Sequence, residues 1–200
     1  HIDIKKSQII LNEDIFSWLK DSFLPSPRRA AEQRYRKSQR KASQKASQGM
    51  HGSSNNVIHT KADSLVAASV EPTGENEAKI TNSKGSIKLK IKISSANKPG
   101  EVHVVPVEEI LDGLLWQPAY IDSNQGVEIN TGHPYYQKVY LPNMQNGVAV
   151  QGLDSLMWAL CVAELNTVNG ATAKHSEVIR YEVSKLLRSL VDDLPEPDLG

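Results

Sequence analysis

The sequence predicts an α+β fold: a small antiparallel sheet packed against a C-terminal antiparallel helix pair, with a long flexible linker in the centre of the chain. Three observations lead to this prediction. Residues 87–93 alternate between apolar side chains and lysines, the period of a strand with one buried face. Residues 153–165 are apolar on nearly every side of a helix, which indicates burial on several sides. Residues 172–194 repeat apolar side chains at the helical period, and the short break before them favours antiparallel neighbours.

The composition divides the 200-residue chain into three parts. Hydrophobic residues make up 39% of it, below the roughly 45–50% of ordinary domains, because residues 26–86 hold few large apolar side chains. We expect residues 1–25 to be a strand–hairpin–helix segment that ends an upstream domain. Residues 26–85 should be a basic helix and a low-complexity linker, and residues 86–200 an α+β module. Since the chain begins at His1, without Met, we expect a fragment of a longer protein.

The charge and the cysteine content narrow the function classes. The net charge is zero, so the whole chain has no strong attraction to nucleic acid or membrane. Cys161 is the single cysteine, which excludes an internal disulfide and a cysteine-based zinc site, and its apolar neighbours indicate a buried, inert thiol. The six histidines lack metal-ligand spacing, so no metal site is predicted. Without a signal peptide or an apolar run of about 18 residues, the expected location is cytoplasmic, with no membrane partner.

The first half of the chain predicts little packed structure after its N-terminal elements. Residues 1–11 contain two short apolar runs that favour a hairpin, and Asn12 is the expected N-cap of a helix that Pro25 interrupts. Residues 28–48 favour helix by composition but lack an apolar stripe, so we expect a solvated or partly ordered helix. Residues 49–85 bury too little surface to offset the entropy of ordering, which predicts a mobile linker.

The middle of the chain predicts three further elements from its apolar runs and turn residues. They are a strand at residues 102–105, a short helix at residues 107–111, and a hairpin formed by residues 114–121 and 127–130. The chain then changes from strand to helix at a strand-to-helix switch. Asn130 or Thr131 is the expected N-cap of this helix, and Pro134 lies in its first turn. Thr172 is the expected cap of the last helix.

His133 is the candidate site residue of this switch, together with Asn130, Thr131, Pro134 and Tyr135. A ligand or proton-transfer role is one interpretation. The alternative is a histidine that fixes the turn by hydrogen bonds, and this structural role is the one we expect.

A basic segment is the candidate site for nucleic acid. Eight basic residues and a single acid lie from Arg28 to Lys45, a pattern that suits a phosphate backbone or a solvated helix face. The candidate contacts are Arg28, Arg29, Arg34, Arg36, Lys37, Arg40 and Lys41. A second basic face lies on the strand at residues 87–93. We expect this face to be solvated, and phosphate binding is the alternative. The sequence contains no Walker-type loop and no supported Ser–His–Asp set.

Three stretches carry a family resemblance. The first is HIDI at residues 1–4 with FSWL at residues 16–19, followed by the arginine-rich residues 34–37. The second is VEINTGHPYY at residues 127–136, similar to an Asn-x-x-His-Pro-Phe-Tyr pattern. The third is the apolar helix that ends at residues 163–165, with a final helix after it. Together they resemble the C-terminal region of bacterial and phage ATPases of the gyrase B, Hsp90, histidine kinase and MutL (GHKL) superfamily.

The resemblance implies that the ATP and Mg site lies in an upstream ATPase domain, because the acidic and Gly-rich motifs of that site are missing from this sequence. The chain itself then holds no cofactor and no catalytic site. Lys5 or Lys6 is the implied residue that reaches the γ-phosphate of ATP from a downstream domain. The implied function is a transducer or interaction region, with a homodimer or another protein as partner, in phage (antiviral) defence or DNA processing.

Two other functions stay open. A non-enzymatic nucleic-acid-binding adaptor would use residues 28–45 to contact DNA or RNA. Its binding would weaken, with a flatter salt dependence, when Arg34, Arg36, Arg40 and Lys41 are changed to Glu. Equal binding by the variant and the parent chain would remove this function. The third is an enzyme with an unrecognised site.

Overall fold

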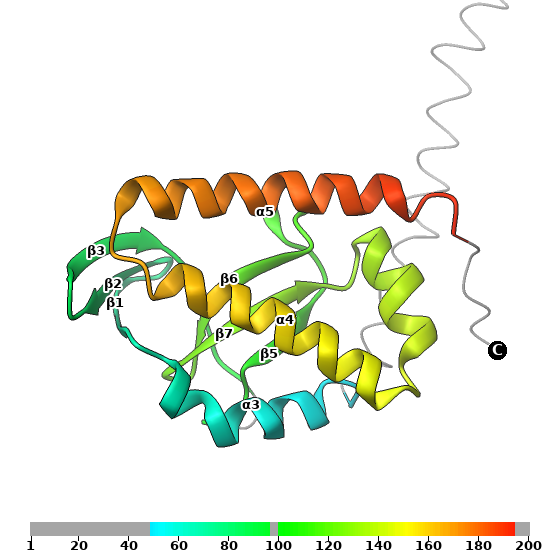
Figure 1. The fold of residues 1–200 in the computed structure, drawn as a ribbon, viewed down its shortest axis with the longest axis horizontal. Helices are drawn as coiled ribbons and strands as arrows, with labels where there is room; N and C mark the ends of the chain where they lie inside the picture. Colours follow the sequence, from blue (N-terminus) through cyan, green and yellow to red (C-terminus); the bar gives the residue numbers. More distant parts are fainter. Residues whose placement is uncertain (1–48, 97–99, 195–200) are drawn as a thin grey trace, which may run out of the picture. The chain divides into compact units, whose positions relative to one another are not determined.

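The structure is a computed structural model that describes residues 49–96 and 100–194 (Figure 1). All described residues belong to one compact unit. The strands and helix predicted for residues 1–25, and the basic helix predicted for residues 28–48, lie outside the described residues.

The described part of the chain confirms the α+β class. Its α-helices are α3 (Gly52–Leu65), α4 (Gly147–Leu165) and α5 (Gly170–Leu190). An antiparallel sheet has the order β1-β2-β3, formed by β1 (Ser69–Gly74), β2 (Glu77–Asn82) and β3 (Gly85–Lys90). A mixed sheet has the order β4-β6-β7-β5, formed by β4 (Lys92–Ser94), β6 (Trp116–Ile121), β7 (Asn124–Asn130) and β5 (Val104–Val107). Short helical turns are η3 (Leu111–Gly113), η4 (Tyr136–Tyr140) and η5 (Leu141–Asn143).

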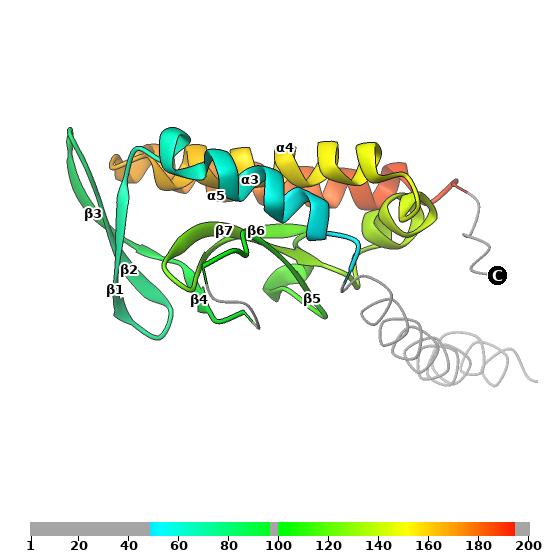
Figure 2. The ribbon, with the colours of Figure 1, turned by 90° about the horizontal axis from the view of Figure 1, so that it is seen from below.

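The three helices cover one face of the four-stranded sheet, as Figure 2 shows from the side. Trp116 lies opposite Ile129 in the β6–β7 pair, and residues directly opposite each other point to the same face. Both side chains are buried in the main core, together with Met157 and Cys161 of α4. Cys161 is fully buried, so the prediction of a buried cysteine is confirmed. This burial raises the pKa of its thiol.

The hairpin of β6 and β7 is confirmed, but its turn is shorter than predicted. Asp122 and Ser123 both have positive φ, 45° and 80°, and β7 already begins at Asn124. Left-handed values at both central residues are typical of a two-residue type I′ turn, whose twist matches the twist of the strands.

Residues 87–93 form two strands in different sheets, so the prediction of one continuous strand is wrong. Ile91, 3% exposed, lies in the second core at the point where the chain passes from β3 to β4. β4 pairs in parallel with β6 and not with the three-stranded sheet. The lysines Lys88, Lys90 and Lys92 are exposed, as expected, but only Lys88 and Lys90 share a strand face, because Lys92 belongs to β4.

Residues 49–85 are ordered, and the expected linker is wrong for this stretch. They form α3, β1 and β2. Ile58 and Ala62, one helical turn apart, are buried against the main core, and Ala78 and Ile80 are fully buried in the second core. These few apolar residues are enough because they recur at the helical and strand periods. The part of the predicted linker before residue 49 lies outside the described residues.

The short helix predicted for residues 107–111 is also wrong. Pro106 and Val107 continue β5, because β5 pairs in parallel with β7 and the Val107 carbonyl accepts the Thr131 N–H at 2.8 Å. A single turn, η3, follows instead at Leu111–Gly113.

The C-terminal helix pair is confirmed, and Figure 1 shows α4 and α5 running in opposite directions and diverging from their short connection. The side chain of Asn169 accepts the N–H groups of Ala171 and Thr172, so Asn169 and not Thr172 caps α5. Arg180, halfway along α5, binds Glu164 in the last turn of α4 at 3.2 Å.

Among the described residues, α4 is the one helix long and apolar enough to cross a membrane by length and composition. One side of α4 packs into the main core through Met157, Trp158 and Cys161. Asp154, which would be costly in lipid, is fully buried in a polar cluster on the side that faces the protein.

Candidate functional site

The turn after β7 is held together by its own side chains. The Asn130 amide donates to the Leu114 carbonyl at 2.8 Å, and its oxygen accepts the Gly132 N–H at 2.9 Å. The Thr131 hydroxyl donates to the Val107 carbonyl at 3.0 Å. The helical turn then begins at Pro134, as predicted. These bonds connect the ends of β5 and β7 to the loop before β6.

His133 joins this turn to α5. Its Nδ1 accepts the Tyr135 N–H at 3.1 Å, which places the ring proton on Nε2, and Nε2 donates to the Ser184 carbonyl at 3.0 Å. The Ser184 hydroxyl in turn accepts the Leu115 N–H at 2.9 Å. Burial lowers the pKa of His133 to about 4, so the ring is neutral at neutral pH. Both ring nitrogens are used inside the fold, which supports the structural role expected for His133.

A second buried histidine lies at the start of α3, and the sequence analysis did not identify it. His51 Nδ1 lies 2.8 Å from Asp154 Oδ2 of α4, and His51 Nε2 lies 3.0 Å from the Tyr136 hydroxyl. The Tyr136 and Tyr140 rings stack at 4.9 Å between centroids. Burial, with the Asp154 carboxylate nearby, raises the pKa of Tyr140. The partners are about 85 and 103 residues from His51 in sequence, so no local spacing could have revealed the cluster.

The His51 cluster resembles a catalytic dyad only in its composition. His51 lines the cavity described below but is only 2% exposed, and Asp154 is fully buried, so the pair presents almost no surface to a substrate. The Nε2 atom, which faces the nucleophile in a Ser–His–Asp triad, faces a tyrosine hydroxyl here. We therefore assign the cluster to the attachment of α3 to α4.

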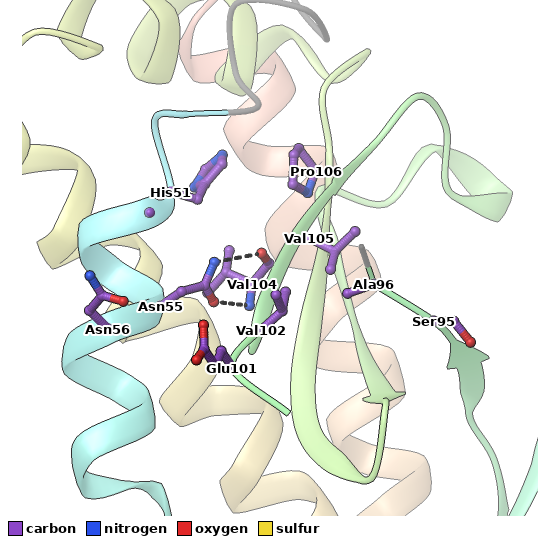
Figure 3. Close-up of a pocket in the computed structure, with 11 residues that line it drawn as sticks. His51, Asn55, Asn56, Ser95, Ala96, Glu101, Val102, Val104, Val105 and Pro106 are labelled. Atoms are coloured by element: carbon purple, nitrogen blue, oxygen red, sulfur yellow. Dashed lines mark hydrogen bonds between the residues drawn. The ribbon is translucent and has the colours of Figure 1, made fainter. Parts of the chain in front are cut away.

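A cavity of about 400 Å³ lies between the start of α3 and the edge strand β5 (Figure 3). Its lining is mixed, with Val104 and Pro106 beside polar residues such as His51 and Glu101. Asn55 points across it to β5, where its oxygen accepts the His103 and Val104 N–H groups at 2.7 and 2.8 Å and its amide donates to the Val104 carbonyl at 3.2 Å. The central polar side chain of the cavity is thus already bonded to the protein.

The remaining sequence candidates are not brought together by the described structure. Lys5, Lys6 and the basic candidates Arg28, Arg29, Arg34, Arg36, Lys37, Arg40 and Lys41 all lie outside the described residues. Lys79 and Lys88 lie directly opposite each other on β2 and β3, and Glu71 of β1 lies opposite Lys79. This exposed sheet face therefore mixes both signs of charge. In the described ranges, no group of three or more His, Cys, Asp or Glu side chains could hold a metal ion.

α4 and α5 each carry exposed apolar side chains, and we name the set the α4–α5 apolar face. Its members expose between 45% and 72% of their surface. They are Leu156, Leu160, Ile179, Leu186 and Leu190.

The helical period places the members within each helix on one side of that helix. Leu156 and Leu160 precede Glu164 by two turns and one turn, so they lie on the side of α4 that faces Arg180 of α5. On α5, Ile179, Leu186 and Leu190 flank Val183, which is partly buried against the core.

The sequence analysis missed this face because it assigned every periodic apolar residue of α5 to the core. In the structure, Val183 and Leu187 pack against the core, whereas Leu186 and Leu190 are 58% and 72% exposed. The signal that could have revealed the exposed residues is the width of the apolar arc on α5. Ile179, Val183, Leu186, Leu187 and Leu190 cover more of the helix surface than one sheet contact can bury.

Comparisons of this chain with protein-family models, with curated proteins and with solved structures found no match in any of the three.

Proposed function

We propose that this chain is a non-catalytic interaction region that relays the state of a GHKL-type ATP-binding domain upstream of it. The observation that carries the proposal is the α4–α5 apolar face. Single exposed leucines are ordinary on protein surfaces, but five large apolar side chains exposed on two successive helices favour a protein–protein contact.

The internal hydrogen bonding of the module supports a role without chemistry. The ring nitrogens of His51 and His133 and the side chain of Asn55 are bonded within the fold. A catalytic group must instead present a proton or lone pair to a substrate.

A relay also requires that the helices and the sheets move together, and the contacts of Asn166 supply this link. Asn166 follows the last turn of α4, and its side-chain oxygen accepts the N–H groups of Ala67 and Ala68, just before β1, at 3.1 and 3.0 Å. Its carbonyl accepts the Asn82 amide at the end of β2 at 2.7 Å. A shift of α4 is thereby passed to the three-stranded sheet.

By the family resemblance, ATP and Mg bind in the upstream domain, where Lys5 or Lys6 is the proposed γ-phosphate contact. The proposed setting is cytoplasmic, in phage defence or DNA processing.

The test joins this chain to the sequence that naturally precedes His1 and follows amide hydrogen exchange with and without ATP and Mg. We expect ATP to slow exchange in α4 and α5. In the Leu156→Lys/Leu186→Lys variant this slowing should be lost, whereas Leu65→Lys on α3, an equally exposed leucine outside the face, should retain it. An upstream sequence that binds no ATP, or exchange that does not respond to ATP, would overturn the relay.

A further inference from the structure

We infer that the chain binds a zinc ion between α3 and the residue before β5, with the rings of His59 and His103 as its two protein ligands and water in the remaining positions. The two histidines are 44 residues apart in sequence, so only the fold brings them together. This site is separate from the α4–α5 apolar face and from the proposed relay.

The two rings face each other through the nitrogens that a metal needs. His59 Nδ1 lies 3.3 Å from His103 Nε2. The other nitrogen of His103, Nδ1, donates to the Gln125 carbonyl at 3.3 Å, so Nε2 carries a lone pair on the side of His59. A histidine that binds a metal almost always donates its second ring nitrogen to a carbonyl or a carboxylate. His103 has this arrangement before any metal binds.

The distance between the two nitrogens favours a tetrahedral ion. Two nitrogens at the usual Zn–N distance of about 2.0–2.1 Å, separated by the tetrahedral angle, lie about 3.3–3.4 Å apart. Neighbouring ligands of a square-planar copper or nickel ion would lie only about 2.8–3.0 Å apart. In the metal-free chain, His59 donates its Nδ1 proton to His103. When zinc binds, that proton is carried on Nε2 of His59, so both rings bind as neutral imidazoles.

The surroundings of the pair give the ion access and a counter-charge. His59 and Asp63, one turn apart on α3, are exposed, and Asp63 lines a second cavity, of about 240 Å³, together with the buried His103. Burial lowers the pKa of His103, although the Gln125 carbonyl and the Asp63 carboxylate oppose this shift. Asp63 therefore acts on His103 electrostatically, and in the proposed site its carboxylate accepts a hydrogen bond from a zinc-bound water.

Water completes the coordination, because the described ranges hold no set of three His, Cys, Asp or Glu ligands. Gln125 also lines the second cavity, and its buried side-chain oxygen has no hydrogen-bond partner among the described residues. A buried oxygen of this kind commonly indicates a bound water or ion.

Zinc at this position would join α3 to β5 a second time. Asn55, one turn before His59 on α3, already accepts the His103 and Val104 N–H groups. An ion bound only by the folded chain stabilises it in proportion to its occupancy. The site is thus a clamp that fastens α3 to the edge of the four-stranded sheet.

The first experiment titrates the full 200-residue chain with Zn²⁺ at neutral pH by isothermal titration calorimetry. We expect His59→Gln to weaken zinc binding at least about tenfold, since even the loss of an outer-shell partner costs that much. His59 is exposed, so circular dichroism should show an unchanged fold. Asp63→Asn should weaken binding by a smaller factor. His175→Gln, at an exposed position of α5, is the matched control and should bind zinc like the parent.

The second experiment locates the ion by ¹⁵N NMR of the histidine rings. Zinc should shift the resonances of His59 Nδ1 and His103 Nε2. It should leave the rings of His51 and His133 unchanged, because their nitrogens are bonded inside the fold. Zinc should also raise the urea midpoint of the parent chain but not that of His59→Gln.

Equal zinc affinity of His59→Gln and the parent chain would overturn the site. Zinc-induced shifts confined to His1 or His175, or a folded parent chain that binds no zinc, would overturn it as well. The relay is tested separately, through ATP and the α4–α5 apolar face, so the failure of one proposal leaves the other standing.

Discussion

Gly126 is a residue whose missing side chain the fold requires. A Cβ atom there would lie 2.5 Å from Ile121 Cδ1 and 2.7 Å from the His103 backbone oxygen. That oxygen cannot move freely, because it accepts the Val127 N–H at 2.8 Å between β5 and β7. We predict that Gly126→Ala lowers the free energy of unfolding by about 1–3 kcal/mol, measured by urea titration.

Gly152 is the matched control, since a Cβ atom there meets nothing within 4 Å in the middle of α4. Gly152→Ala should raise the free energy of unfolding by about 0.5–1 kcal/mol, because alanine loses less backbone entropy in a helix. Equal effects of the two substitutions would contradict the packing described for Gly126.

His133 makes the stability depend on pH. Burial lowers its pKa from 6.5 to about 4 in the folded protein, against the opposing effect of the hydrogen bond to the Ser184 carbonyl. The unfolded chain therefore binds more protons between these values, and the stability from neutral His133 is complete above pH 6.5 and lost as the pH falls toward 4. Burial also lowers the pKa of His103, which acts in the same direction.

We predict that the urea midpoint of unfolding falls from pH 7.5 to pH 5, and that His133→Gln makes this fall smaller. Glutamine can still donate to the Ser184 carbonyl but does not titrate. His175→Gln, at an exposed position of α5, is the control and should retain the parent slope. The same slope in both variants would show that His133 is not the titrating group.

At the scale of elements, β5 depends on α3 for the protection of its edge. It pairs with β7 on one side, and on the other side Asn55 binds the His103 and Val104 N–H groups and the Val104 carbonyl. Pro106 has no N–H to offer there. An edge strand with unpaired groups is a template for another chain, so Asn55 protects the protein from edge-to-edge pairing.

We predict that Asn55→Ala destabilises the protein by about 1–3 kcal/mol in urea unfolding and increases aggregation on heating, followed by light scattering. Asn55→Asp keeps the acceptor for the two N–H groups and loses only the donor, so its effect should be smaller. Asn56→Ala, at the exposed neighbouring position, should change neither measurement. An unaltered Asn55→Ala protein would mean that water satisfies the β5 edge equally well.

The elements also show why sequence reasoning succeeded in some places and failed in others. α4 and α5 were predictable because their apolar residues are many and periodic. α3 was not, because Ile58 and Ala62 are few among polar residues and Asn55 acts through distant hydrogen bonds. The break at Ile91 was hidden because alternation continues from β3 into β4 although the two strands join different sheets.

At the scale of the whole molecule, the fold class followed from periodicity, but the proposed interaction surface did not. The role of His133 in its turn was predictable from its neighbours Asn130 and Pro134, although its bond to Ser184 was not. The His51–Asp154 contact joins residues about 100 positions apart, and the α4–α5 apolar face exists because the sheet buries only part of each helix. Both depend on tertiary placement.

The coupling of the two sheets is the property on which a relay depends, and Asn166 tests it. Asn166→Ala would leave the Ala67 and Ala68 N–H groups without the side-chain acceptor that now holds them. We predict that amide exchange becomes faster in β1, β2 and β3 while β6 and β7 keep their protection. Asn166→Asp, which retains the acceptor, should exchange like the parent. Faster exchange in both sheets alike would show a single cooperative unit, in which α4 could not shift the three-stranded sheet by itself.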